Sequence, residues 1–143
     1  MAFRGFDHVD LRVPSLAAVE SFYAALLPKL GLTRKAYSYV DPRGDWYDAD
    51  AERYNAVEWY EDATDGRAGA FFGVIEDADM VVPRTRIAFA MPREGLEGWM
   101  DELRAIGARE VEFWEHEDRY WAVFFTDPIG TRFELVARIP RKH

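Results

Sequence analysis

The sequence predicts an α+β protein in which a strand–helix–strand–strand–strand unit occurs twice. Two short alternating runs, FDHVDLRVP at residues 6–14 and TRIAFAMP at residues 85–92, each end in proline and precede a stretch with helical spacing. Aligning His8 with Arg86 gives an offset of 78 residues, and the same offset aligns Pro14 with Pro92. A repeat of this kind indicates that one structural unit was duplicated.

The first half begins with a strand and continues with an amphipathic helix. Side chains alternate over residues 6–13, so Val9 and its apolar neighbours face one side, and the polar residues His8, Asp10 and Arg12 face the other. Ser15 is the candidate N-cap of the helix, and Gly31 is expected to end it. The apolar stripe between them comprises Leu16, Val19, Phe22 or Tyr23, Leu26 and Leu30.

The remaining elements follow the same order in both halves. Short apolar or alternating runs predict strands over residues 33–40, 55–60 and 69–76. The second half predicts a strand over 85–91, a helix that stops at Gly107, and strands over 110–114, 120–126 and 131–137. The last two strands are joined by DPIG, which suits a type I turn. We therefore expect one domain, residues 1–143, with modules at about 1–80 and 84–139.

Composition excludes several classes of partner. Eighteen basic and twenty-six acidic side chains give a formal net charge of −8, which repels nucleic-acid phosphates and anionic lipid. No apolar run is long enough to span a membrane, and the first residues lack the apolar core of a secretory signal. The chain has no cysteine, which excludes disulfides and thiol nucleophiles. We expect a cytoplasmic protein that binds neither nucleic acid nor membranes.

Three stretches resemble the vicinal oxygen chelate superfamily, which includes glyoxalase I, bleomycin-resistance proteins and extradiol dioxygenases. FDHVDLRVPSLAAVESFYAALLPKLGL is similar to its opening strand and helix, RIAFAMP to its middle strand, and FFTDPIGTRFELV to its closing strand pair. The resemblance covers essentially the whole chain. It implies paired βαβββ modules whose curved mixed sheets surround an open cleft, and we expect a homodimer.

The resemblance also implies a metal site on the first and last strands of the modules. His8 matches the first-strand ligand and Glu134 the last-strand carboxylate, a donor pair that suits a divalent metal such as Fe, Mn, Ni or Zn. Arg86 stands where the second module should supply histidine, and a guanidinium cannot ligate a cation. The strand over 69–76 offers no ligating side chain where the family has Glu or Gln. We therefore expect an incomplete metal site, in which Arg86 forms an ion pair with Glu134 or holds an anionic ligand.

Aromatic and charged side chains are the candidates for ligand binding. Trp46 and Tyr47 lie in the polar stretch DPRGDWYDADAER, where the local pattern requires no core residue, so we expect them to cover a cleft or a partner. The complete set of candidate ligand-binding residues is Asp10, Arg12, Trp46, Tyr47, Arg86, Trp121 and Phe124.

Two classes of function remain open. In the first, the chain binds a small aromatic or anionic molecule in its cleft without the complete family metal site. In the second, it is a divalent-metal-dependent lyase, isomerase or dioxygenase with His8 and Glu134 as the candidate catalytic residues. A metal-free enzyme that uses either residue as a general base is a further alternative. We prefer the first class, because two of the four expected ligand positions cannot bind metal.

Overall fold

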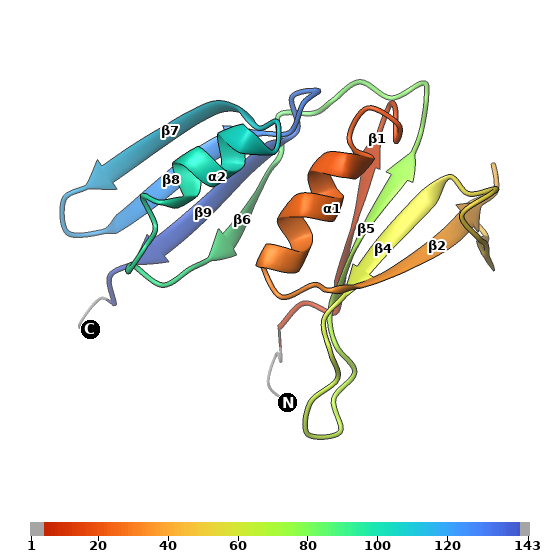
Figure 1. Cartoon of the computed structure of the whole chain (residues 1–143), viewed down its shortest axis with the longest axis horizontal. Helices are drawn as coiled ribbons and strands as arrows, with labels where there is room; N and C mark the ends of the chain where they lie inside the picture. The colour runs from red at the N-terminus through yellow and green to blue at the C-terminus, as the bar shows by residue number, and fades with distance from the viewer. Residues whose placement is uncertain (1–4, 141–143) are drawn as a thin grey trace. The chain divides into compact units, whose positions relative to one another are not determined.

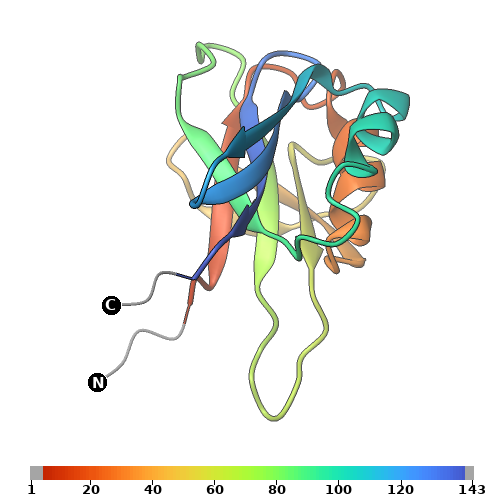
Figure 2. The same ribbon diagram turned by 90° about the vertical axis from the view of Figure 1, so that its left-hand side faces the viewer.

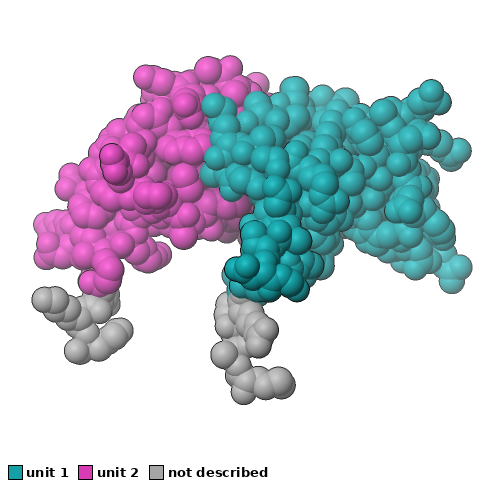
Figure 3. All heavy atoms as spheres, turned by 60° about the horizontal axis from the view of Figure 1, so that its bottom comes forward, with its two compact units in different colours: residues 1–81 teal, residues 82–143 magenta. Residues whose placement is uncertain are grey.

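The computed structural model describes residues 5–140 (Figure 1). The chain divides into two compact units, residues 1–81 and residues 82–143, which Figure 3 shows in different colours. Each unit contains one helix and one mixed β-sheet. No helix in the described part of the chain is long and apolar enough to cross a membrane.

Unit 1 follows the predicted strand–helix–strand–strand–strand plan with one added strand. Its elements are β1 His8–Val13, α1 Glu20–Lys29, β2 Arg34–Val40, β3 Trp46–Asp48, β4 Ala56–Tyr60 and β5 Phe71–Glu76. The strand order in the sheet is β1-β5-β4-β2-β3, with β1 parallel to β5 and the other neighbours antiparallel. Figure 1 shows α1 across one face of this sheet, where Tyr23 packs against Trp59 and Phe72.

Unit 2 has the same plan without the added strand. Its elements are β6 Arg86–Ala90, α2 Trp99–Ala105, β7 Arg109–His116, β8 Tyr120–Thr126 and β9 Arg132–Arg138. The strand order is β6-β9-β8-β7, and the first strand again runs parallel to the last. Helix α2 covers one face of this sheet (Figure 2), and Phe125 and Phe133 stack with 5.5 Å between their ring centroids. All predicted strands are confirmed to within two residues at each end.

The start of α1 corrects the prediction. The helix begins at Glu20 with Val19 as its N-cap, so the prediction of Ser15 as the N-cap is wrong. Ser15 instead accepts a hydrogen bond from the N–H of Ala18, and the N–H of Leu16 is held by a carboxylate oxygen of Glu76 at 3.0 Å. The turn that follows leads directly into α1, since the N–H of Glu20 donates to the carbonyl of Leu16 at 2.8 Å. The predicted end is confirmed, since Gly31 has a φ of +92°, a conformation that glycine adopts without strain.

Strand β3 was not predicted from the sequence. Asp41 accepts backbone N–H bonds from Arg43 and Asp45, which forms a tight turn directly after β2. The turn returns the chain so that Trp46 pairs with Val40. Three residues are too few for an alternating pattern to be recognised, so only the turn geometry produces this strand.

In both units one sheet face carries the helix, and we call the opposite face the helix-free face. Because successive side chains of a strand point to opposite sides, the register assigns each residue to a face. In unit 1, His8, Asp10 and Glu58 share the helix-free face. In unit 2, Arg86 and Phe124 share it. These five side chains therefore belong to the faces that the helices leave uncovered within each unit.

Candidate functional site

The helix-free face of unit 1 holds a cavity of about 340 Å³, which we call the His8 pocket. Its charged lining consists of His8, Asp10, Asp48 and Glu58. Its aromatic lining consists of Trp46, Tyr47, Tyr60 and Phe71. Three strands, β1, β3 and β4, therefore contribute carboxylates to one hollow.

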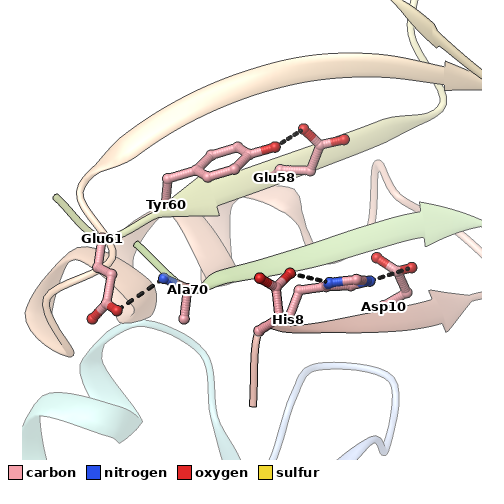
Figure 4. A network of polar contacts seen from close by, with 7 residues as sticks. His8, Asp10, Glu58, Tyr60, Glu61 and Ala70 are labelled. Carbon is pink, nitrogen blue, oxygen red and sulfur yellow. Dashed lines mark hydrogen bonds and ion pairs between the residues drawn. The ribbon is translucent and has the colours of Figure 1, made fainter. Parts of the chain in front are cut away.

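Two carboxylates and one aromatic ring fix the orientation of His8. Its Nδ1 lies 2.7 Å from Oδ1 of Asp7, and its Nε2 lies 3.6 Å from Oδ2 of Asp10 (Figure 4). The imidazole stacks on Phe71, with 4.4 Å between the ring centroids and 4° between their planes. The hydrogen bond to Asp7 raises the pKa of His8 above its ordinary value of 6.5, with smaller contributions from the charges of Asp10 and Asp7 and an opposing effect of burial.

Glu58 is the buried carboxylate of this pocket. Only 5% of its surface is exposed, and its Oε2 accepts a hydrogen bond of 3.0 Å from the hydroxyl of Tyr60 (Figure 4). Burial, followed by the hydrogen bond to Glu58, raises the pKa of Tyr60 to about 12. Tyr60 is therefore a neutral hydrogen-bond donor at physiological pH.

Gly73 separates Asp10 from Glu58. It pairs with Asp10 on one side and with Glu58 on the other. A Cβ atom at Gly73 would lie 3.0 Å from Oδ1 of Asp10 and 3.6 Å from Cγ of Glu58. Glycine therefore leaves the floor of the pocket without a side chain between the two acids.

The helix-free face of unit 2 holds a larger cavity of about 600 Å³, the Arg86 pocket. The guanidinium of Arg86 lies over the ring of Phe124, 4.7 Å from its centroid. Arg86 pairs in register with Arg132, so two guanidinium groups project from neighbouring strands into the same hollow. Among the described residues, neither guanidinium group forms an ion pair or a hydrogen bond. Trp114 adds an aromatic wall, since its ring meets Phe124 edge to face at 6.4 Å.

The expected ion pair between Arg86 and Glu134 is not formed in the described structure. Glu134 lies on the same face, but its register partners are Ala88 on β6 and Phe124 on β8. Arg86 lies two residues before Ala88 on β6, opposite Arg132, and its guanidinium contacts the ring of Phe124 instead of the Glu134 carboxylate. The cationic side chain therefore retains its hydrogen-bonding edges for another acceptor.

Two of the seven candidate ligand-binding residues, and the candidate metal ligand Glu134, are not part of either pocket lining. Arg12 forms an ion pair with Asp77 at 3.5 Å. Trp121 lies on the opposite face of the second sheet from Phe124, where its Nε1–H donates to Glu115 and Arg93 lies over its ring. The remaining candidates divide between the pockets, with Asp10, Trp46 and Tyr47 in the first and Arg86 and Phe124 in the second.

Sequence reasoning did not select Glu58 or Arg132. Glu58 stands in the otherwise apolar run AVEWY, and a carboxylate in the middle of a buried strand is the signal that could have identified it. Arg132 precedes Phe133 and Glu134 in the closing strand, and only its register with Arg86 marks it.

The donor atoms present do not fit a divalent metal within either unit. Among residues 5–140, no group of three or more His, Asp or Glu side chains is arranged to hold a metal ion. His8 is already bonded to Asp7, and Arg86 occupies the corresponding strand of unit 2. His8 and Glu134, the predicted metal ligands, belong to different units.

The fold and sequence pattern agree with one known family. Residues 5–135 match the family model described as the glyoxalase/bleomycin resistance protein/dioxygenase superfamily. The chain belongs to this superfamily. The match covers most of the chain, and the expected α+β fold with two βαβββ-like modules is confirmed.

Solved structures of other superfamily proteins share the fold at low identity. The fosfomycin resistance protein FosX from Listeria monocytogenes matches with a TM-score of 0.64 and 16% identity, covering 95% of this chain and 94% of that one. A lactoylglutathione lyase from Agrobacterium tumefaciens matches with a TM-score of 0.58 and 14% identity, covering 95% of each chain. Both likenesses concern the fold alone. No curated protein matches this sequence.

Proposed function

We propose that this superfamily member binds a small anionic molecule with an aromatic or apolar part in the Arg86 pocket, without the complete family metal site. The observation that carries the proposal is the position of Arg86, stacked on Phe124 beside Arg132 with no carboxylate partner among the described residues. Two neighbouring guanidinium groups repel each other, and a bound anion removes that repulsion.

The chemistry of the pocket suits such a ligand. A guanidinium that rests on an aromatic ring keeps its N–H edges free, and these edges match the two oxygens of a carboxylate or phosphonate. Trp114 is 54% exposed and gives an apolar surface on which an aromatic ligand can stack. Glu110 and Glu112 also line the pocket, but among the described residues neither forms an ion pair with Arg86 or Arg132, and Glu112 accepts a hydrogen bond from Nε1 of Trp114.

A related structure supports an oxyanion as the ligand class. FosX, in a Glu-to-Gln mutant form, was solved with Mn(II) and 1S,2S-dihydroxypropylphosphonic acid, and it shares 18% identity with this chain at a TM-score of 0.61. That structure also favours the second candidate function, a metal-dependent lyase, isomerase or dioxygenase that uses His8 and Glu134. We rank this second candidate lower, because Arg86 replaces a ligand with a permanent cation.

Calorimetric titration with benzoate and phenylphosphonate tests the proposal. Arg86→Ala should weaken binding of both anions about ten- to a hundredfold, because one charge-assisted contact is lost. Arg104→Ala is the matched control, since it removes the same charge from α2 on the other face. Equal losses in the two variants would show only a change of overall charge and would contradict the proposal.

Two further measurements separate the candidates and test the assembly. Protein purified without an affinity tag or added ions should contain less than stoichiometric transition metal, and a stoichiometric metal would favour the metal-dependent candidate.

We also propose that the chain is a homodimer, which the family resemblance implies. Sedimentation equilibrium should then give twice the chain mass of 16.6 kDa.

A further inference from the structure

The His8 pocket contains a buried acid whose hydrogen bonding is incomplete. Glu58 is almost fully buried, and Tyr60 is its hydrogen-bond donor. The bond reaches Oε2, and no donor among the described residues reaches Oε1. Oε1 of Glu58 is not among the fully buried atoms that lack a partner, so it is open to the pocket and can accept a hydrogen bond from a ligand.

The surrounding charge favours a cation as that ligand. Asp10 lies across Gly73 from Glu58, and Asp48 contributes a third carboxylate from β3. The positive group of the lining is the imidazole of His8, which is engaged by Asp7 and Asp10. Three carboxylates therefore outweigh one imidazole even when His8 is protonated, and the pocket repels anions.

The aromatic lining favours an organic cation. Phe71 is covered by His8, and the guanidinium of Arg34 lies 4.8 Å from the centre of the Tyr60 ring. Each of these two rings therefore already has a partner on one face. Trp46 is 42% exposed and has no ring contact or cation among the described residues. An indole face next to carboxylates attracts an ammonium group and its carbon substituents.

A metal ion fits this pocket less well than an organic cation. The described acids and histidine form no group of three that could hold a metal. A divalent ion needs several short bonds at fixed angles, whereas an ammonium group makes hydrogen bonds over a broader range of positions.

The geometry points to the His8 pocket as a binding site for a primary organic ammonium ion. The ammonium group donates hydrogen bonds to Glu58 and Asp10, and the carbon part lies against Trp46. Gly73 leaves the space between the two acids in which the ammonium group lies. All residues of this site belong to unit 1, whereas those of the Arg86 pocket belong to unit 2.

The test compares benzylammonium with benzyl alcohol by calorimetric titration of the full chain. Benzylammonium should bind at least about tenfold more tightly, because only the cation supplies charge-assisted hydrogen bonds. Equal affinities, or tighter binding of benzoate in the presence of Arg86→Ala, would overturn the assignment. A stoichiometric Zn²⁺ or Mn²⁺ that benzylammonium cannot displace from this pocket would also overturn it.

Variants locate the site. Glu58→Gln keeps the shape and an acceptor for Tyr60, and it should weaken benzylammonium binding about ten- to a hundredfold. Asp10→Asn should also weaken benzylammonium binding, and this variant tests the site if Glu58→Gln does not fold. Asp79→Asn, an exposed acid beyond the end of β5, removes the same charge and should leave the affinity unchanged. Equal effects of Asp10→Asn and Asp79→Asn would contradict the assignment.

Discussion

The guanidinium of Arg86 lies 4.7 Å from the centre of the Phe124 ring, on the helix-free face of unit 2. The two residues come from β6 and β8, which are separated in the sheet by β9. This contact replaces the expected ion pair with Glu134 and keeps a cation at the position where the sequence resemblance implied a metal-binding histidine. The ring of Phe124 therefore positions the guanidinium of Arg86 in the pocket.

Phe124→Leu should therefore weaken benzoate binding while Arg86 is retained. The substitution removes the ring that supports the guanidinium, a contact worth about 0.5–1 kcal/mol at a partly exposed site, which corresponds to a few-fold loss of affinity. Calorimetric titration measures the loss. If Phe124→Leu binds benzoate as tightly as the unchanged protein, the ring does not position Arg86.

Tyr60→Phe should destabilise the protein. Buried Glu58 then loses its hydrogen-bond donor, which costs about 1–3 kcal/mol in the free energy of unfolding. Tyr47→Phe is the matched control, because the hydroxyl of Tyr47 makes an exposed bond of 3.4 Å to Asp41 and its loss should have little effect. Urea denaturation of both variants measures the difference, and similar midpoints would contradict the role of Tyr60.

Alkaline titration should show two tyrosines that ionise late. The pKa of Tyr60 is raised to about 12 by burial and by Glu58, and that of Tyr54 to about 12 by a hydrogen bond to Glu20 and by burial. A raised tyrosine pKa means that the unfolded chain loses the proton first, so stability falls as the pH rises from about 10 to about 12. Phenolate absorbance follows the titration, and Tyr60→Phe should remove one of the late groups. If Tyr60→Phe instead removes a tyrosine that ionises at its ordinary pH, the raised pKa belongs to another residue.

The pKa of His8 should lie above its ordinary value of 6.5, and Asp7→Asn should lower it. Because the pKa of His8 is raised in the folded protein, the protonated imidazole stabilises the fold. This contribution to the free energy of unfolding is fully present below the pKa of the unfolded chain, and it is lost as the pH rises through the pKa of the folded protein. NMR titration of the His8 imidazole resonances in both proteins measures both effects. A His8 pKa unchanged by Asp7→Asn would show that the hydrogen bond is not its cause.

Gly73→Ala should fold and should weaken benzylammonium binding. The new Cβ would meet Oδ1 of Asp10 at 3.0 Å, and that side chain can move away, but the methyl group would then occupy the floor of the His8 pocket. Gly69→Ala is a contrasting variant, since its Cβ would overlap the backbone carbonyl of Glu61 and should destabilise the fold. Thermal unfolding and calorimetric titration together distinguish the two effects, and undiminished binding in Gly73→Ala would place the ammonium elsewhere.

Much of the architecture was determined by local patterns in the sequence. Alternation in FDHVDLRVP and TRIAFAMP places His8 and Arg86 on the polar sides of equivalent strands, because side chains of a strand point alternately to its two faces. Gly31 and Gly107 end the helical stretches, since both adopt a positive φ that other residues avoid. These features depend on neighbours in the chain, and the sequence alone therefore predicts them.

The pairing of side chains from different strands was decided only by the tertiary structure. Arg86 meets Phe124 and Arg132 through the register of β6, β9 and β8, and Glu58 faces Asp10 across Gly73 through the register of β4, β5 and β1. A shift of one residue in any of these registers would move the side chains of that strand to the opposite face. The sequence gives the charged residues, whereas the sheet order determines that Arg86 and Arg132 share one pocket and that Asp10, Asp48 and Glu58 share the other.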